Sequence, residues 1–118
     1  MTAASDFGVL LTTLPSRAEA ARMADLLVEE RLAACVQMVS IDSVYRWEGA
    51  LQHEPETLLL IKTRTALFEP AIARIRQNHP YSVPEIVGTP FMAGLSTYLD
   101  WIGEETRAAI SGGASPAR

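Results

Sequence analysis

The sequence predicts an α+β fold with the element order β-α-β-β-α-β and one further helix at the C-terminus. Two observations support this prediction. Amphipathic helical patterns alternate with apolar runs of strand length, and two long extended runs meet at a short turn near Gly49. The second pattern predicts a long β-hairpin that projects from the sheet. The chain has 118 residues, of which 48% are hydrophobic and 20% charged, as is typical of one globular domain.

The first strand is predicted over residues 7–13, a short apolar run of the kind that is covered on both faces. A helix follows it. Ser16 and Glu19 have the spacing of a capping box, in which the two side chains satisfy free backbone N–H groups at the helix start. The helix is expected to end near residues 31–32, and its apolar positions recur at helical intervals: Ala20, Met23, Ala24, Leu27 and Val28.

Residues 35–48 and 51–64 predict the two arms of the hairpin, joined by a two-residue turn at Gly49 and Ala50. The apolar positions of the first arm change parity, which predicts a bend or bulge near residues 40–43. Pro55 cannot donate a ladder hydrogen bond, so the outer half of the second arm is expected at an edge. Its inner half, residues 58–61, is apolar throughout and is expected to be buried on both faces.

Thr65 is the candidate cap of a second helix, and Pro70 is tolerated only in the first turn of that helix. A fourth strand is predicted over residues 84–91, and Ser96 is the candidate cap of the last helix. This order is the ferredoxin-like split βαβ sandwich, with helices on one face of a largely antiparallel sheet. The single domain has an expected core of residues 7–105, and residues 111–118 are expected to form a disordered tail.

The charge and the cysteine content of the chain indicate which partners it can bind and in which cell compartment it works. The net charge is −4, and the ten basic residues form no run, so no nucleic-acid partner is expected. The single cysteine, Cys35, excludes an intramolecular disulfide and favours a reducing compartment. The first residues show no export-signal pattern and no apolar run long enough for a membrane span. A cytoplasmic protein without a membrane partner is therefore expected.

The predicted sheet is apolar on both faces at residues 9–11, 36–41 and 58–61, although both inner helices cover one face only. The hairpin arms also carry Trp47 and project roughly 20 Å, at about 3.3 Å per residue. Soluble proteins usually cover apolar patches of this size, so a second copy of the chain is expected to cover them. The alternative is that the hairpin folds back over its own sheet.

Five segments together resemble the CutA family of divalent-ion tolerance proteins: "EERLAACV", "SVYRWEG", "LLLIKTR", "HPYSVPEI" and "YLDWI". The resemblance extends over roughly residues 8–103. It implies a ferredoxin-like fold akin to the PII signalling proteins, a tight homotrimer, and a role in tolerance to copper and other divalent metals. It implies no enzyme activity, and no cofactor is obligatory.

The resemblance also implies a metal site with His79 and Glu85 as ligands. Thr12 occupies a position at which the family has a cysteine. Because a thiolate is the best ligand for Cu(I), its loss predicts weak binding of Cu(II) or another divalent cation with little selectivity. In the alternative interpretation, His79 caps the C-terminus of the second helix and Glu85 pairs with a basic residue.

Several other polar and aromatic residues are candidates for a site. Trp47, Tyr81 and Trp101 are interpreted as packing or interface residues. In the alternative interpretation, they line an intersubunit cleft together with Lys62, and a small anionic ligand binds there. Cys35 is interpreted as a small buried hydrophobic residue. Acidic residues and one histidine near the hairpin either gather divalent ions or form a solvated edge: Glu48, His53, Glu54 and Glu56.

No nucleotide-binding, zinc-protease or hydrolase motif occurs in the sequence. Arg17 follows the first strand but lacks the glycine-rich loop that an acylphosphatase of the same fold requires. Three functional classes stay open: a metal-binding tolerance protein, a PII-like sensor of a small anion, and a non-catalytic scaffold for a partner protein.

Overall fold

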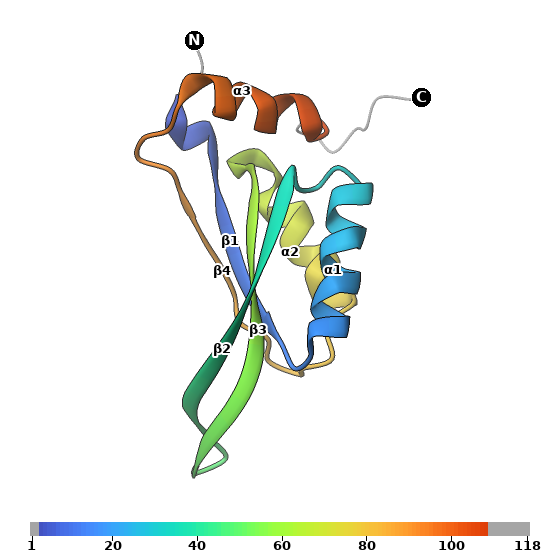
Figure 1. Ribbon diagram of the computed structural model, residues 1–118, viewed down its shortest axis with the longest axis vertical. Helices are drawn as coiled ribbons and strands as arrows, with labels where there is room; N and C mark the ends of the chain where they lie inside the picture. Colours follow the sequence, from blue (N-terminus) through green and yellow to red (C-terminus); the bar gives the residue numbers. More distant parts are fainter. Residues whose placement is uncertain (1–2, 109–118) are drawn as a thin grey trace.

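The computed structural model describes residues 3–108 and contains one four-stranded antiparallel sheet with the strand order β2-β3-β1-β4. The strands are β1 (Phe7–Leu14), β2 (Cys35–Trp47), β3 (Ala50–Arg64) and β4 (Ile86–Pro90). The helices are α1 (Arg17–Glu29), α2 (Phe68–Gln77) and α3 (Ser96–Glu105), with short 3-10 turns η1 (Ala4–Asp6) and η2 (Thr65–Leu67). Figure 1 shows α1 and α2 on one side of the sheet, α3 across one end, and the β2–β3 hairpin projecting from the other end. The predicted α+β, ferredoxin-like fold is confirmed.

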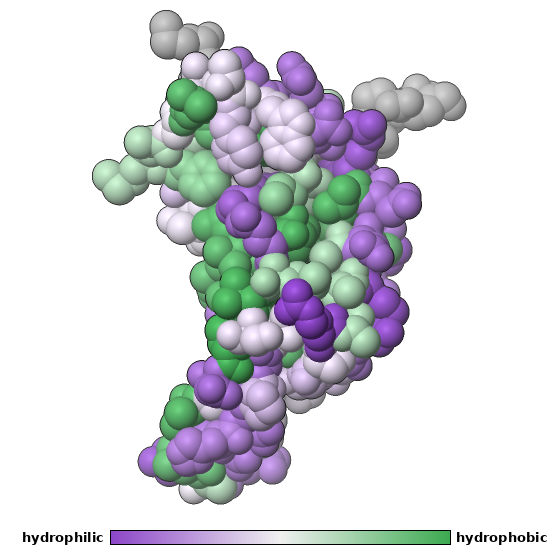
Figure 2. Space-filling model, in the orientation of Figure 1, coloured by the Kyte–Doolittle hydropathy of each residue, from purple (hydrophilic) through white to green (hydrophobic). Residues whose placement is uncertain are grey.

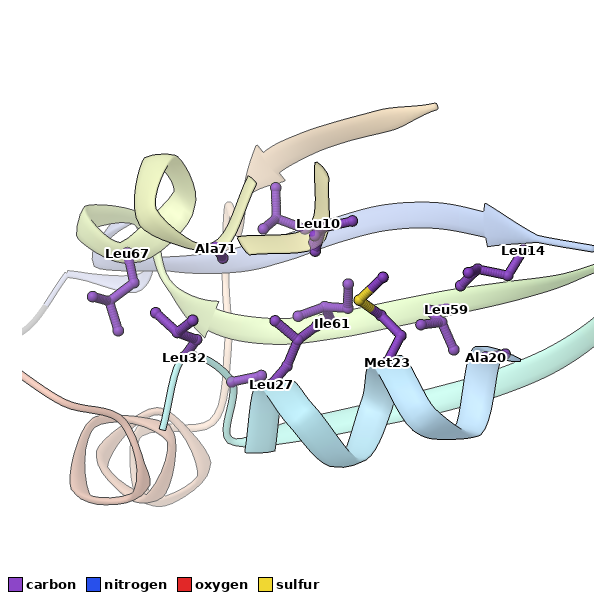
Figure 3. Close-up of a cluster of buried hydrophobic side chains, with 12 residues drawn as sticks. Leu10, Leu14, Ala20, Met23, Leu27, Leu32, Leu59, Ile61, Leu67 and Ala71 are labelled. Atoms are coloured by element: carbon purple, nitrogen blue, oxygen red, sulfur yellow. The ribbon is translucent and has the colours of Figure 1, made fainter. Parts of the chain in front are cut away.

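Helix α1 begins where the sequence predicts, but only half of the predicted capping box forms, because the Glu19 carboxylate accepts from the Ser16 hydroxyl at 3.4 Å and not from the Ser16 backbone N–H. The Ser16 hydroxyl accepts a hydrogen bond from the backbone N–H of Glu19, with 3.2 Å between the heavy atoms. Met23 and Leu27 then point from α1 toward Leu59 and Ile61 of β3 (Figure 3). Full burial of a leucine or isoleucine side chain contributes about 1.5–3 kcal/mol, so this contact is a major part of the core between helices and sheet.

The hairpin has an unbroken register, from the pair Cys35–Lys62 to the pair Trp47–Ala50. The predicted bulge near residues 40–43 is therefore wrong. The apolar positions change parity because both faces of β2 carry apolar residues, one face in its inner part and the other further along. Met38 packs against the core beneath the helices, whereas Val39 lies on the opposite face.

The turn of the hairpin is formed by Glu48 and Gly49, one residue earlier than predicted. Both residues have positive φ, 50° and 81°. Two successive residues with positive φ are typical of the type I′ turn, whose twist matches that of the flanking strands.

The N-termini of the later helices differ from the prediction. The Thr65 hydroxyl donates to the Ser5 carbonyl, 3.1 Å away, and caps no helix. Ser96 is the first residue of α3, and the capping position before it is occupied by Leu95, which makes no side-chain bond. Pro70 is the third residue of α2 and so lies in its first turn, as predicted.

The sheet face opposite α1 and α2 is only partly covered. Helix α3 closes one end of it, where the side chains of Leu99 and Ile102 cover Phe7. The Arg64 guanidinium fastens this helix, donating to the Gly103 carbonyl at 2.6 Å and to the Thr106 hydroxyl at 2.9 Å.

Beyond α3 this face is open and largely apolar, apart from Lys62 and Gln37, and we call it the open face. Its central residues are half-buried, and Val39 and Val87 on the two edge strands are 45% and 53% exposed. Hydrophobic side chains gather below α3 in the space-filling view (Figure 2). Within residues 3–108, no helix has the length and apolar character needed to cross a membrane. The predicted tail, residues 111–118, lies outside the described residues.

Candidate functional site: an aromatic and acidic groove

A groove of about 640 Å³ lies between the hairpin and the segment that links α2 to β4. We call it the hairpin groove. Tyr45 and Trp47 are two residues apart on β2 and therefore point to the same side of the strand. The full lining comprises Thr13, Ser43, Val44, Tyr45, Trp47, Glu56, Pro80, Tyr81, Ser82, Val83 and Glu85.

Tyr81 is fixed across the groove by a hydrogen bond to the hairpin. Its hydroxyl donates to Oε2 of Glu56, 2.8 Å away. Burial raises the pKa of Tyr81 well above its usual value, and the bond to Glu56 adds to this effect. The phenol therefore stays protonated and keeps its hydrogen bond to Glu56.

His79 anchors the same segment to the end of β1. Its Nε2 donates to the Thr13 carbonyl, 2.8 Å away, and its Nδ1 accepts from the Tyr81 N–H at 3.2 Å. Only the neutral tautomer with the proton on Nε2 makes both bonds. Burial lowers the pKa of His79, outweighing the raising effects of the Thr13 carbonyl and of Glu19 and Glu56. The alternative in which the His79 ring caps α2 is wrong, because the ring makes these two bonds instead.

The two predicted metal ligands line different cavities. Glu85 is exposed and lines the hairpin groove, whereas His79 lines a smaller pocket between α1 and the end of α2. Thr12 is fully buried in the core. Among residues 3–108, no group of three or more His, Cys, Asp or Glu side chains lies close enough together to hold a metal ion. Metal binding by His79 and Glu85 stays a prediction.

Of the four residues predicted for an intersubunit cleft, only two lie together within the chain. Trp47 and Tyr81 line the hairpin groove, but Lys62 and Trp101 do not. Lys62 Nζ donates to Oε1 of Gln37, 2.7 Å away on the neighbouring strand. Trp101 stacks on Tyr98 of α3, with ring centroids 5.6 Å apart.

The remaining candidates are spread over the structure. Cys35 is a free, half-buried thiol. Burial raises the pKa of the neighbouring Tyr98, and Cys35 adds to this effect. His53 and Glu54 are exposed on the hairpin, away from the lining of the groove. Of the four candidates near the hairpin, only Glu56 lines the groove.

Sequence reasoning missed Tyr45 as a wall of the groove and Glu56 as the partner of Tyr81. The alternation along β2 places Tyr45 beside Trp47, so this signal is present in the sequence. The hydrogen bond between residues 56 and 81 joins two segments that no local pattern connects.

The sequence profile of the CutA1 divalent ion tolerance proteins matches residues 8–105. The chain belongs to the CutA1 family. This result confirms the family inferred from the five sequence segments.

Relatives in the CutA1 family come from bacteria, archaea, plants and animals. The chain is 48% identical over 99 residues to the divalent-cation tolerance protein CutA of Thermus thermophilus, covering 83% of this chain and 96% of that relative. It is 44% identical over 100 residues to the chloroplastic protein CutA of Arabidopsis thaliana, covering 84% of this chain. The chain spans about half the length of that plant relative, 55%.

Solved CutA1 structures have the same fold. The Thermus thermophilus structure matches with a TM-score of 0.82 at 47% identity, covering 86% of this chain and 99% of that one. The CutA structure from Archaeoglobus fulgidus, described as a periplasmic divalent cation tolerance protein, matches with a TM-score of 0.82 at 36% identity. The match covers 84% of this chain and 97% of the Archaeoglobus fulgidus chain.

Proposed function

We propose that the protein acts in divalent-cation tolerance as a non-catalytic homotrimer that binds Cu(II) and other divalent cations weakly. The observation that carries this proposal is the CutA1 family match, which extends over residues 8–105. The apolar open face supports self-association, since an isolated chain exposes it to water. The number of three copies follows the family resemblance.

The hydrogen bonds of the His79 ring support weak metal binding. Both ring nitrogens are held by backbone partners, so a metal ion gains the imidazole only by displacing one of these hydrogen bonds. A hydrogen bond between uncharged groups contributes about 0.5–1.5 kcal/mol. Breaking one of them makes the free energy of metal binding less favourable by about that amount. Glu85 supplies a carboxylate oxygen, and water or a second copy supplies the other ligands.

Calorimetric titration of the full chain with Cu(II) and with Zn(II) tests this site. We expect low affinity for both ions, and we expect Glu85→Gln and His79→Ala each to remove most of the binding. Cys35→Ser is the matched control and should leave the affinity unchanged. Because only neutral imidazole binds a metal and burial lowers the pKa of His79, affinity should persist at the unperturbed histidine value of about 6.5 and fade at lower pH. Unchanged Cu(II) binding in both Glu85→Gln and His79→Ala would place the metal elsewhere.

We also propose that the protein works in a reducing compartment such as the cytoplasm. The single Cys35 is a free thiol, which is the usual state of cysteine in that environment. Fractionation of cells that produce the full-length protein tests this proposal, and recovery in a periplasmic or membrane fraction would contradict it.

A further inference from the structure

We propose that a pocket between the start of α1 and the hairpin binds a small zwitterion, a ligand that carries one carboxylate and one ammonium group. We call it the α1 pocket, and its volume is about 340 Å³. It lies where the hairpin begins to project from the sheet (Figure 1). This ligand class goes beyond the divalent metal ions of the proposed function.

The α1 pocket lies on the helix side of the sheet, opposite the open face. Ser40 and Asp42 on β2 have the strand parity of Met38, which packs against the core beneath the helices. Thr57 is the cross-strand partner of Ser40 on β3 and points to the same side. A second copy docked on the open face therefore lies across the sheet from this pocket.

The wall formed by α1 presents hydrogen-bond donors to a carboxylate. The Ser16 hydroxyl accepts from the Glu19 N–H, and the Ser16 carbonyl accepts from the Ala20 N–H. The N–H groups of Arg17 and Ala18 have no partner among residues 3–108. The helix dipole places partial positive charge at these groups, and the Arg17 side chain in the lining adds a full charge.

A buried hydroxyl in the lining also lacks a partner. Thr57 is 4% exposed, and its hydroxyl forms no hydrogen bond within residues 3–108. Among those residues, only the Thr12 hydroxyl is both unpartnered and fully enclosed, so the Thr57 hydroxyl is accessible from the pocket. A hydroxyl at this depth has lost most of its contact with water. A ligand carboxylate that accepts from it restores a hydrogen bond.

Asp42 supplies the opposite charge on the hairpin wall. Arg17 and Asp42 both line the pocket, but their charged groups lie more than 4.0 Å apart and form no ion pair. The other acid in the lining, Glu56, has its carboxylate on the opposite side of the sheet, where it accepts from Tyr81. The pocket therefore has one positive wall and one negative wall.

Two walls of opposite charge select against ligands that carry one charge only. A simple anion is attracted by the α1 wall and repelled by Asp42, whereas a simple cation is repelled by Arg17. A zwitterion pairs with both walls when its two charges have the right separation. Its carboxylate then lies at the start of α1 and the Thr57 hydroxyl, and its ammonium group lies at Asp42.

Three zwitterions that differ only in chain length test this ligand class: glycine, β-alanine and γ-aminobutyrate. Amide NMR spectra of the full chain locate the binding, because a carboxylate at the start of α1 shifts the N–H signals of Arg17 and Ala18. We expect at least one of the three to shift both signals saturably, in EDTA at constant ionic strength. The matching acids without the amino group, acetate, propionate and butyrate, should bind several-fold more weakly.

Two shape-conserving variants assign the binding to the α1 pocket. We expect Thr57→Val and Asp42→Asn each to weaken the best of the three ligands several-fold. Asp25→Asn, which alters an exposed acid of α1 outside the pocket, is the matched control and should leave the affinity unchanged.

Three results would overturn the proposal: no saturable shift with any of the three zwitterions, equal affinity for the matching acid without the amino group, or full affinity in both Thr57→Val and Asp42→Asn. The amide spectrum of each variant shows directly whether its fold is retained. Because EDTA removes metal ions, these results do not depend on whether Cu(II) binds at His79 and Glu85.

Discussion

Thr12 is a fully buried polar residue whose hydroxyl has no hydrogen-bond partner among the described residues. It lies in the middle of β1, where it pairs with Leu59 of β3 on one side and Ile86 of β4 on the other. An unsatisfied buried polar group costs about 1–3 kcal/mol. The position at which the family resemblance implies a cysteine thus lies in the core of this chain and holds a destabilising hydroxyl.

We predict that Thr12→Val raises the free energy of unfolding by about 1 kcal/mol, because it replaces the hydroxyl by a methyl group of the same shape. Thr12→Ser keeps the hydroxyl and removes the methyl, and it should lower stability by about 1 kcal/mol. Urea unfolding of the three proteins measures both changes. A less stable Thr12→Val variant would mean that the hydroxyl has a partner, such as a buried water.

His79 makes the stability of the fold depend on pH. Its pKa is lowered in the folded chain, chiefly by burial, while the unfolded chain regains a value of about 6.5. Between these two pKa values the unfolded state binds more protons, so acid favours unfolding. The stabilisation is fully present above about pH 6.5 and is lost as the pH falls through the folded-state pKa.

We therefore predict that His79→Gln reduces the loss of stability on going below about pH 6.5. Chemical unfolding on both sides of that pH measures the difference between parent and variant. His53→Gln, which alters the other histidine on the exposed hairpin, is the matched control. An unchanged pH slope in His79→Gln would contradict a role for its protonation.

At the scale of elements, the hairpin turn holds a non-glycine residue at positive φ. Glu48 has φ of 50°, and a left-handed conformation costs an ordinary residue about 1–2 kcal/mol. Asparagine tolerates this conformation, and Asn-Gly is a preferred type I′ pair. We predict that Glu48→Asn stabilises the outer hairpin by about 0.5–1 kcal/mol, measured by amide hydrogen exchange of the outer strands. Gly49→Ala should increase exchange there, and equal exchange in both variants would contradict this account.

The elements themselves were largely predictable, because they depend on local patterns. The apolar stripe and the Ser16 cap located α1, and the position of Pro70 limited the start of α2. The turn position was not predictable, because the long-range pairing of Cys35 with Lys62 fixes the register of the whole hairpin. Changing the turn by one residue would move every side chain of one arm to the other face.

The candidate site was predictable only in part. Trp47 and Tyr81 were predicted for an intersubunit cleft and Glu85 as a metal ligand. All three line the hairpin groove, and both roles stay predictions. The hydrogen bonds of His79 could not be predicted, because its partner Thr13 lies 66 positions away in the sequence. Contacts of this kind depend on how β1 meets the end of α2, and no local pattern in either segment records it.

At the scale of the whole molecule, the open face makes assembly testable. We predict that light scattering gives three times the chain mass of 12.9 kDa. Val39→Glu places a charge on the open face, where burial of an unpaired ion costs several kcal/mol, and should dissociate the assembly. Val28→Glu is a matched control, since Val28 on α1 is 43% exposed and Val39 is 45% exposed. A monomeric parent, or an intact trimer in Val39→Glu, would contradict the proposed homotrimer.

The position of α3 determines where a fused segment leaves the fold. The described chain starts at η1 and finishes just after α3, and both places lie at the end of the molecule away from the hairpin (Figure 1). Arg64 ties the last turn of α3 to β3, so this exit point is fixed rather than free to swing toward the groove. A purification handle, fluorescent protein or surface tether joined directly to residue 3 or to residue 108 would therefore begin at the pole opposite the hairpin.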